Sequence, residues 1–191
     1  SNATAVGSGA ADKAVGQLGI TAIGKDALGA LGTGPTSVGN YNTAVGWSCL
    51  DGTIDGANNT AVGVGALSAD CVNDNTAMGV DALTLFTGSN ATAIGSGAAD
   101  AATSAANLTA VGKNAAGAVT SSDDHTAVGA DALASCTTGA QNTAIGTSAA
   151  FSLTGSSNVM VGMQAGYYAS TVDHSVAIGR DALLGVASFT E

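Results

Sequence analysis

The chain has little charge, few aromatic residues and almost no proline. Charged residues make up 9% and aromatic residues 4% of its 191 residues, and Pro35 is the single proline. So few large side chains do not fill one broad core, which argues against an ordinary globule. Apolar residues are nevertheless 46% of the chain and recur periodically, which argues against disorder. The composition favours a thin core repeated along an axis.

Basic residues are especially scarce. Lys and Arg number 4 against 14 Asp and Glu, for a net charge of −10. Four scattered cations do not form a surface that neutralises phosphates, so we expect no nucleic-acid partner. The sequence holds no apolar stretch of the length that crosses a bilayer as a helix, so we expect no direct membrane insertion.

The three cysteines, Cys49, Cys71 and Cys136, are too few and too scattered for a disulfide framework or a zinc site. Cys71 and Cys136 lie four repeats apart, which is about 19 Å if each repeat rises by one strand spacing of about 4.8 Å. A disulfide needs Cα atoms within about 7 Å. We therefore predict three free thiols, no metal and no cofactor, with Cys49 in the place of a buried Ala.

A string of the form Thr-Ala-Val-Gly-x-x-Ala-Leu recurs eleven times and indicates a repeat array. The anchoring glycines recur with a nearly constant period of about 17 residues, apart from one longer spacing between Gly24 and Gly46. Val, Ile or Met always precedes the glycine, and Ala stands three residues after it in ten of eleven repeats. The anchors are Gly7, Gly24, Gly46, Gly63, Gly79, Gly95, Gly112, Gly129, Gly146, Gly162 and Gly179.

Each string predicts a short strand with two uncharged sides. In the seventh repeat, Thr109 and Val111 point to one side, and Ala110 and Gly112 point to the other. A strand without charge on either side is most simply buried on both. The Ala-Leu pair that follows, as in residues 66–67, predicts a second short strand after a tight turn, and the polar remainder predicts an outer loop.

These elements predict an all-β fold, a parallel β-roll or β-solenoid of eleven coils about 50 Å long. Residues 4–191 form its single domain, with residues 1–3 interpreted as a remnant of tag cleavage. The second buried side of the strands needs a partner, and a closed symmetric oligomer supplies one. We expect a homotrimer of three rolls around a shared axis.

The strings at residues 42–46, 75–79, 142–146 and 175–179 resemble the head repeats of YadA-like trimeric autotransporter adhesins, and similar strings occur in phage tail-fibre shafts. The resemblance implies a left-handed roll, a trimer and an adhesive fibre. It places that fibre outside the cell, either on an outer-membrane-anchored surface structure or on a virion tail. The coils of this chain are longer than the coils of the adhesin heads, which leaves bacterial and phage origin both open.

No group of residues predicts catalysis, so we expect a protein that is not an enzyme. Asp173, His174 and Ser175 have the residue types of a triad, but three contiguous residues cannot adopt its geometry. His125 occupies the place before Thr that Asn usually holds. The Gly-x-Gly strings lack the third glycine and the helix of a nucleotide site, and we interpret them as turns.

Aspartates come in pairs in the predicted outer loops: Asp51 with Asp55, Asp70 with Asp74, and Asp123 with Asp124. Paired carboxylates could hold Ca²⁺, but the spacing of a known calcium loop is absent. We interpret them as a solvated acidic rim that keeps fibres apart, and calcium binding stays open.

Aromatic residues outside the repeat are the candidates for receptor contact. The long spacing between Gly24 and Gly46 reflects an insertion within 29–41, a loop that carries Pro35 and Tyr41, with Trp47 shortly after it. Tyr167 and Tyr168 follow the most irregular repeat string. Exposed loops with aromatic side chains are typical of binding surfaces, here for a host polysaccharide or matrix protein.

Two function classes remain. The first is a structural and adhesive module of a trimeric surface fibre, either a bacterial adhesin head or a phage tail fibre, that attaches to a host receptor. The alternative is an ice-binding β-solenoid, because a regular Thr array on a flat face can match an ice lattice. That alternative needs an exposed plane, and here Thr shares its side with Val or Ile in nearly every repeat.

Overall fold

The structure is a computed structural model that describes residues 2–32 and 39–185. It contains eleven strands and, within the described residues, no helix. The predicted insertion at 29–41 lies partly outside the described residues. The strands are β1 (Ala3–Val6), β2 (Ile20–Ile23), β3 (Thr43–Val45), β4 (Thr60–Val62), β5 (Thr76–Met78), β6 (Thr92–Ile94), β7 (Thr109–Val111), β8 (Thr126–Val128), β9 (Thr143–Ile145), β10 (Val159–Val161) and β11 (Val176–Ile178).

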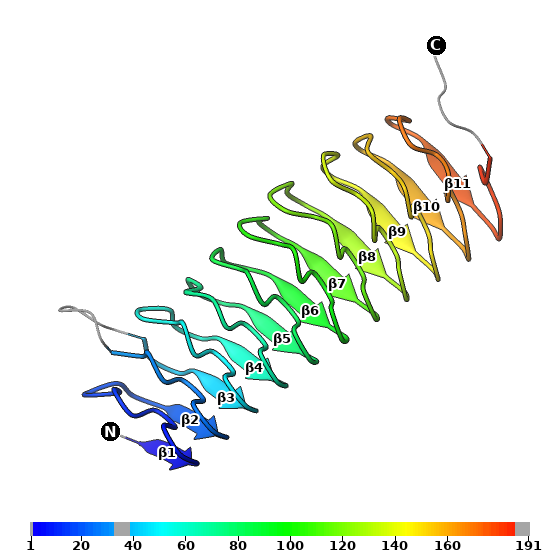
Figure 1. The fold of residues 1–191 in the computed structure, drawn as a ribbon. Coiled ribbons are helices and arrows are strands. Elements are labelled where there is room, and N and C mark those ends of the chain that lie inside the picture. The colour runs from blue at the N-terminus through cyan, green and yellow to red at the C-terminus, as the bar shows by residue number, and fades with distance from the viewer. Residues whose placement is uncertain (1, 33–38, 186–191) are drawn as a thin grey trace.

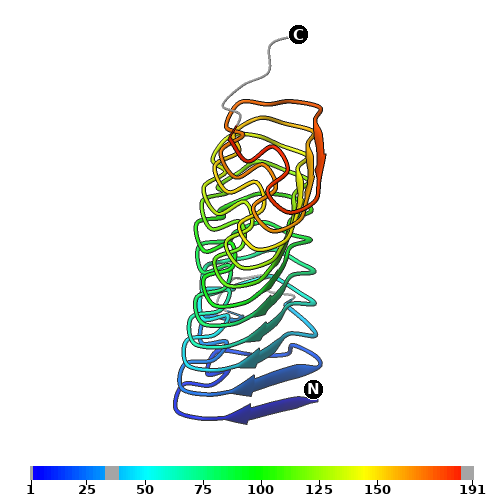
Figure 2. The ribbon, with the colours of Figure 1, turned by 90° about the vertical axis from the view of Figure 1, so that its right-hand side faces the viewer.

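All eleven strands lie in one parallel sheet in chain order, so the chain winds into a β-solenoid of about ten turns (Figure 1). The pairing is in register, with like residues side by side: Thr109 pairs with Thr126, and Val111 with Val128. Viewed along the side, the strands stack on one wall of the solenoid and the turns and loops form the rest (Figure 2). The prediction of an all-β solenoid is confirmed.

The Ala of each string points into the solenoid. From β2 to β9 these Ala side chains are fully buried, and Met160 takes the same place in β10. The Thr side chains on the opposite side are half-buried, and Ile94 is 39% exposed. A single chain therefore buries one side of its strands, the side that holds Ala in nearly every coil, and the Thr and branched aliphatic side chains point outward. The sequence predicts that both sides of the strands are buried, but within one chain only the inward side is.

The anchoring glycines are required by both conformation and space. Gly112 has a φ of +137°, a backbone conformation that residues with a side chain rarely adopt. A Cβ atom at this position would also collide with the carbonyl oxygen of Gly129 in the next coil. The same arrangement repeats from coil to coil, which explains why no other residue replaces these glycines.

The predicted second strand at the Ala-Leu pairs is wrong. Leu67 has a φ of +49°, so the backbone turns with left-handed geometry where a strand would continue. Its N–H still donates to the carbonyl of Ala82 in the next coil at 3.0 Å. The turn directs Leu67 and its equivalents into the core, where their side chains are fully buried: Leu28, Leu50, Leu67, Leu83 and Leu133.

The three cysteines are free, as predicted, and all three are buried, including Cys49, for which burial is predicted. Cys49 lies three residues after Gly46, in the column of buried Ala residues, and is fully enclosed. Burial raises the pKa of the Cys49 and Cys136 thiols to about 11. Burial also raises the pKa of Cys71, whose Sγ lies 3.2 Å from Oγ1 of Thr53. Their surroundings are those of structural thiols.

A column of buried Asn side chains joins the coils at the start of the strands. The Asn75 side chain accepts a hydrogen bond from the N–H of Ala91 and donates one to the carbonyl of Gly88, both at 3.0 Å. Each such Asn forms hydrogen bonds with buried backbone groups of the loops and of the next coil. The buried members of this Asn ladder are Asn42, Asn59, Asn75, Asn142 and Asn158.

Candidate functional site

The outward side of the sheet is the largest candidate surface. Three columns of side chains form it: the residue three before, the residue one before and the residue one after each anchoring glycine. We call this surface the strand face. The first two columns hold no charged residue, and the third holds three: Lys25, Lys113 and Arg180.

Large apolar side chains stay exposed on the strand face along nearly the whole solenoid. Ile94 and Ile145 are 39% and 41% exposed, and Trp47 is 56% exposed. Exposed apolar side chains that recur on one face in nine of eleven coils are typical of an interaction surface in soluble proteins. The exposed large apolar residues of the strand face are Val6, Ile23, Trp47, Val64, Met78, Val80, Ile94, Ile145, Val159, Met163, Val176 and Ile178.

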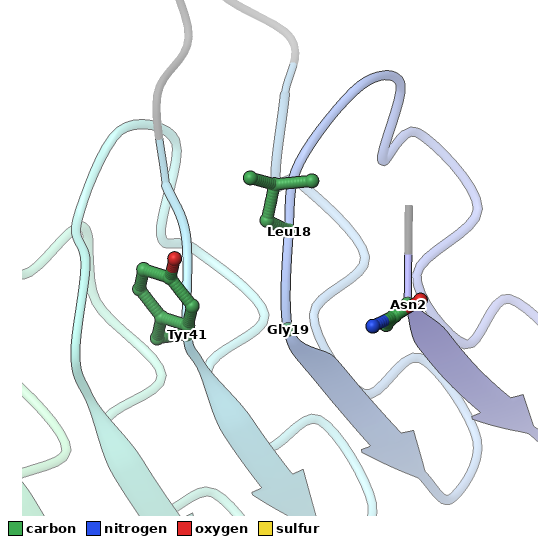
Figure 3. A pocket seen from close by; sticks show the side chains of 4 residues that line it. All are labelled: Asn2, Leu18, Gly19 and Tyr41. Atoms are coloured by element: carbon green, nitrogen blue, oxygen red, sulfur yellow. The ribbon is translucent and has the colours of Figure 1, made fainter.

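Tyr41 lies at the opposite end of the strand from Trp47. Its ring packs on the backbone of Gly19, where any side chain would collide with it, and it lines a shallow pocket with Leu18 and Asn2 (Figure 3). The Tyr41 N–H donates to the carbonyl of Leu18 at 2.8 Å. The pocket is open and small, and its lining carries no charged group.

Trp47 belongs to the strand face. The Nζ atom of Lys25 lies 5.8 Å from the centroid of its ring, and the same Nζ is 3.1 Å from Oδ2 of Asp26. Because β3 separates Tyr41 from Trp47, the structure does not bring these two predicted receptor-binding residues into one site.

Tyr167 and Tyr168, by contrast, do form a cluster, and Phe151 joins them. The Phe151 and Tyr167 rings are stacked with centroids 5.0 Å apart and planes 8° apart. The Tyr168 ring meets Tyr167 edge to face at 4.6 Å and 78°. We call these three residues the aromatic platform. Phe151 is absent from the sequence-based candidates, although its place five residues after Gly146 matches that of Tyr167 after Gly162.

The histidines have no catalytic surroundings. His125 replaces Asn in the Asn ladder: its Nδ1 accepts a hydrogen bond from the N–H of Asn142 at 3.3 Å. Its Nε2 is buried and has no hydrogen-bond partner within the described residues. Burial lowers the pKa of His125 and outweighs the opposing effects of the Gly139 and Asn142 backbone and of the Asp123 and Asp124 carboxylates.

The two residues that flank the exposed His174 form hydrogen bonds with backbone groups. Asp173 Oδ1 accepts a hydrogen bond from the N–H of Ser156 at 2.6 Å, and Ser175 Oγ donates to the Asp173 carbonyl at 3.0 Å. This arrangement ties one coil to the next and does not align a nucleophile with a base.

Several loop aspartates also join adjacent coils. Asp70 Oδ1 accepts from the N–H of Ile54 at 2.9 Å, and Asp123 Oδ1 accepts from the N–H of Ala106 at 2.7 Å. Asp74 and Asp124 accept from Asn side chains of the preceding coil at 3.0 and 2.9 Å. Within the described residues, no three His, Cys, Asp or Glu side chains converge as a metal site would require.

The described part of the chain contains no helix of the length and hydropathy that would cross a membrane. No family model matches the chain, and neither the curated proteins nor the solved structures include a significant match to it.

Proposed function

We propose that this chain is a structural and adhesive module of a homotrimeric fibre exposed on a cell surface or virion tail, where it attaches to a host receptor. The observation that carries the proposal is the strand face, an apolar and almost uncharged surface that runs the length of the solenoid. Burying the strand face between copies removes apolar surface from water, which stabilises the assembly by roughly 25 cal/mol for each Å² of apolar surface buried. A closed ring leaves no such surface unpaired.

The number of copies rests on the resemblance to trimeric adhesin heads, and the adhesive role rests on the loops. Strands committed to stacking and to contacts between copies cannot vary, whereas loops vary without loss of the fold. The loop side also holds many of the aspartates, which would keep neighbouring fibres apart.

Light scattering on the purified chain tests the proposal directly. We expect a mass three times the chain mass of 18.0 kDa at micromolar concentration. The variant Ile94→Asp should reduce this mass to that of one chain, because it places a charge in the apolar contact. Ser104→Asp adds the same charge at an exposed loop position and should leave the trimer intact. A monomeric wild-type chain would contradict the proposal.

Ice binding is the second candidate, favoured by the in-register Thr residues on the strand face. Thr92, Thr109 and Thr126 pair along the sheet, so their spacing is one strand separation, about 4.8 Å. The two functions use the same surface and exclude each other, because a trimer that covers the strand face hides it from ice. A monomer with thermal hysteresis that Thr109→Lys abolishes would establish ice binding.

A further inference from the structure

The aromatic platform lies outside the strand face. Phe151 and Tyr167 stand five residues after their anchoring glycines, beyond the tight turns that follow β9 and β10. Their rings stack along the solenoid axis because coils repeat at nearly the ring-stacking distance, and the centroids are 5.0 Å apart. Stacked and edge-to-face contacts both stabilise aromatic pairs beyond the burial of their apolar surface. The three rings therefore hold one another in place.

Tyr168 presents the accessible ring of this group, with 59% of its surface exposed. The equivalent positions in the coils before and after it are Ser152 and Gly185, so no large side chain at those positions covers the ring. The backbone below it is fixed on both sides. The Tyr168 N–H donates to the Leu184 carbonyl, and the Ser152 N–H donates to the Tyr167 carbonyl, both at 3.2 Å.

The two coils that carry the platform contain no charged residue. Residues 141–171 contain no Asp, Glu, Lys, Arg or His, in a chain whose other regions carry Asp throughout. The next coil carries one cation, Arg180, whose Nε lies 3.3 Å from Oδ2 of Asp181, so this region offers no cluster of cations for the phosphates of nucleic acid. The chemistry that remains is a flat apolar ring face beside phenolic hydroxyls, which both donate and accept hydrogen bonds. A pyranose ring of a neutral sugar has the matching features: an apolar C–H face and hydroxyls around its rim.

We propose that the aromatic platform is a binding site for a neutral glycan, with a pyranose ring stacked on Tyr168 and with Tyr167 and Phe151 as positioning residues. The proposal rests on the adhesive role given above and names the ligand class and the residues for it. Because the rings are ordered before binding, little conformational entropy is lost when the sugar docks.

The test uses the trimeric or monomeric protein as purified, on an array of immobilised neutral gluco-, manno- and galacto-configured hexasaccharides and one sulfated hexasaccharide. We expect binding to at least one neutral hexasaccharide and none to the sulfated one. Tyr168→Ala should weaken that binding by about tenfold or more, which corresponds to about 1.4 kcal/mol. Tyr168→Phe, which keeps the ring, should retain most of it.

The matched control is Leu85→Ala, because Leu85 is 54% exposed, close to the value for Tyr168, and occupies the same place in its coil, six residues after Gly79. It should leave glycan binding unchanged. Absence of binding to every neutral hexasaccharide, or equal binding by Tyr168→Ala, overturns the proposal. Light scattering on each variant distinguishes failure of the glycan-site proposal from failure of the proposed trimeric fibre. A monomeric wild-type chain that binds glycan contradicts the trimer and supports the glycan site. A change of mass in Tyr168→Ala makes the platform a contact between copies and also overturns it.

Discussion

Along the inward side of the strands every position from β2 to β10 is fully enclosed, whereas along the outward side Ile94, Ile145 and Trp47 keep 39–56% of their surface exposed. Both sides are uncharged on the strands themselves, so charge does not separate them. Side-chain size does in nearly every coil: the inner side of the sheet holds Ala from β2 to β9 and Met160 in β10, and the outer side holds mainly Thr and branched aliphatic residues. The comparison teaches that one chain completes its own interior and leaves a second apolar surface for something else to cover.

The largest effect is expected from a charge placed on the inward side. Ala110→Asp puts a carboxylate in a fully buried position with no partner, which should cost at least about 3 kcal/mol and abolish the folded state. Circular dichroism with thermal melting measures this. Val111→Asp, one residue away on the outward side, should keep the β-rich spectrum. Equal unfolding of both variants would show that the two sides do not differ as described.

The Asn ladder should come next, because it satisfies backbone groups inside the coils. Asn75→Ala removes the partner of the Ala91 N–H and one of two donors to the Gly88 carbonyl, which still accepts from the Val72 N–H at 3.1 Å, and should cost about 1–3 kcal/mol in the free energy of unfolding. Urea denaturation measures the loss. Asn58→Gly is the outward control: its side chain is exposed and glycine suits its φ of +59°. A change of less than about 1 kcal/mol is expected there, and a larger loss than in Asn75→Ala would contradict the ladder's importance.

His125 makes the interior sensitive to acid. Burial holds its folded-state pKa below the ordinary value of 6.5, so the unfolded chain binds a proton that the folded chain does not. Stability is fully present above about pH 6.5 and falls below it, by up to about 1.4 kcal/mol per pH unit until the folded-state pKa is reached. Protonated Nδ1 also cannot accept from the Asn142 N–H. Melting temperatures between pH 7.5 and 5 measure the slope.

His125→Asn restores the ladder residue and should remove most of this pH dependence, with equal or higher stability at pH 7. His174→Asn, at an exposed loop position, serves as the control and should leave the slope unchanged. An unaltered slope in His125→Asn would show that the acid sensitivity arises elsewhere.

The smallest effect, a change in reactivity without a change in stability, is expected at the thiols. Because Cys49 and Cys136 are buried and have raised pKa values of about 11, a thiol reagent at pH 8 should label the native chain slowly and the urea-unfolded chain at three sites. Thr109→Cys adds one outward thiol, which should react at once in a monomeric sample. Rapid native labelling of the wild-type cysteines would show an open interior.

Much of the fold follows from the repeat. The period, the strand positions, the like-with-like register and the free cysteines are all predictable from the spacing of the anchoring glycines, because stacked coils place equivalent residues one strand spacing apart. Cys49 was recognisable as a buried residue since it takes the place of an Ala. The second strand was mispredicted because the left-handed φ of residues such as Leu67 leaves no signature in an Ala-Leu pair.

The candidate sites were less predictable. Tyr41 and Trp47 are close together in sequence, yet β3 holds them at opposite ends of a strand. Phe151 and Tyr167 are a full repeat apart in sequence, yet they stack because they occupy the same place in adjacent coils. In a solenoid, sequence neighbours along a strand diverge and residues one period apart meet. Aligning the repeats would have found the platform.

By itself the sequence determined that the chain forms stacked β-coils of nearly constant length, because only glycine fits the close approach of neighbouring coils and only in-register stacking explains a constant Val, Ile or Met before it. Tertiary structure alone decided which side of each strand faces inward. The Ala column and the Thr and Val columns are all uncharged, and both sets of positions alternate along each strand with a period of two residues. The sequence pattern therefore does not distinguish the inward side from the outward side, and the closed coil decides it. In β7 the methyl group of Ala110 lies inside the coil, whereas Thr109 and Val111 point outward and are only half-buried.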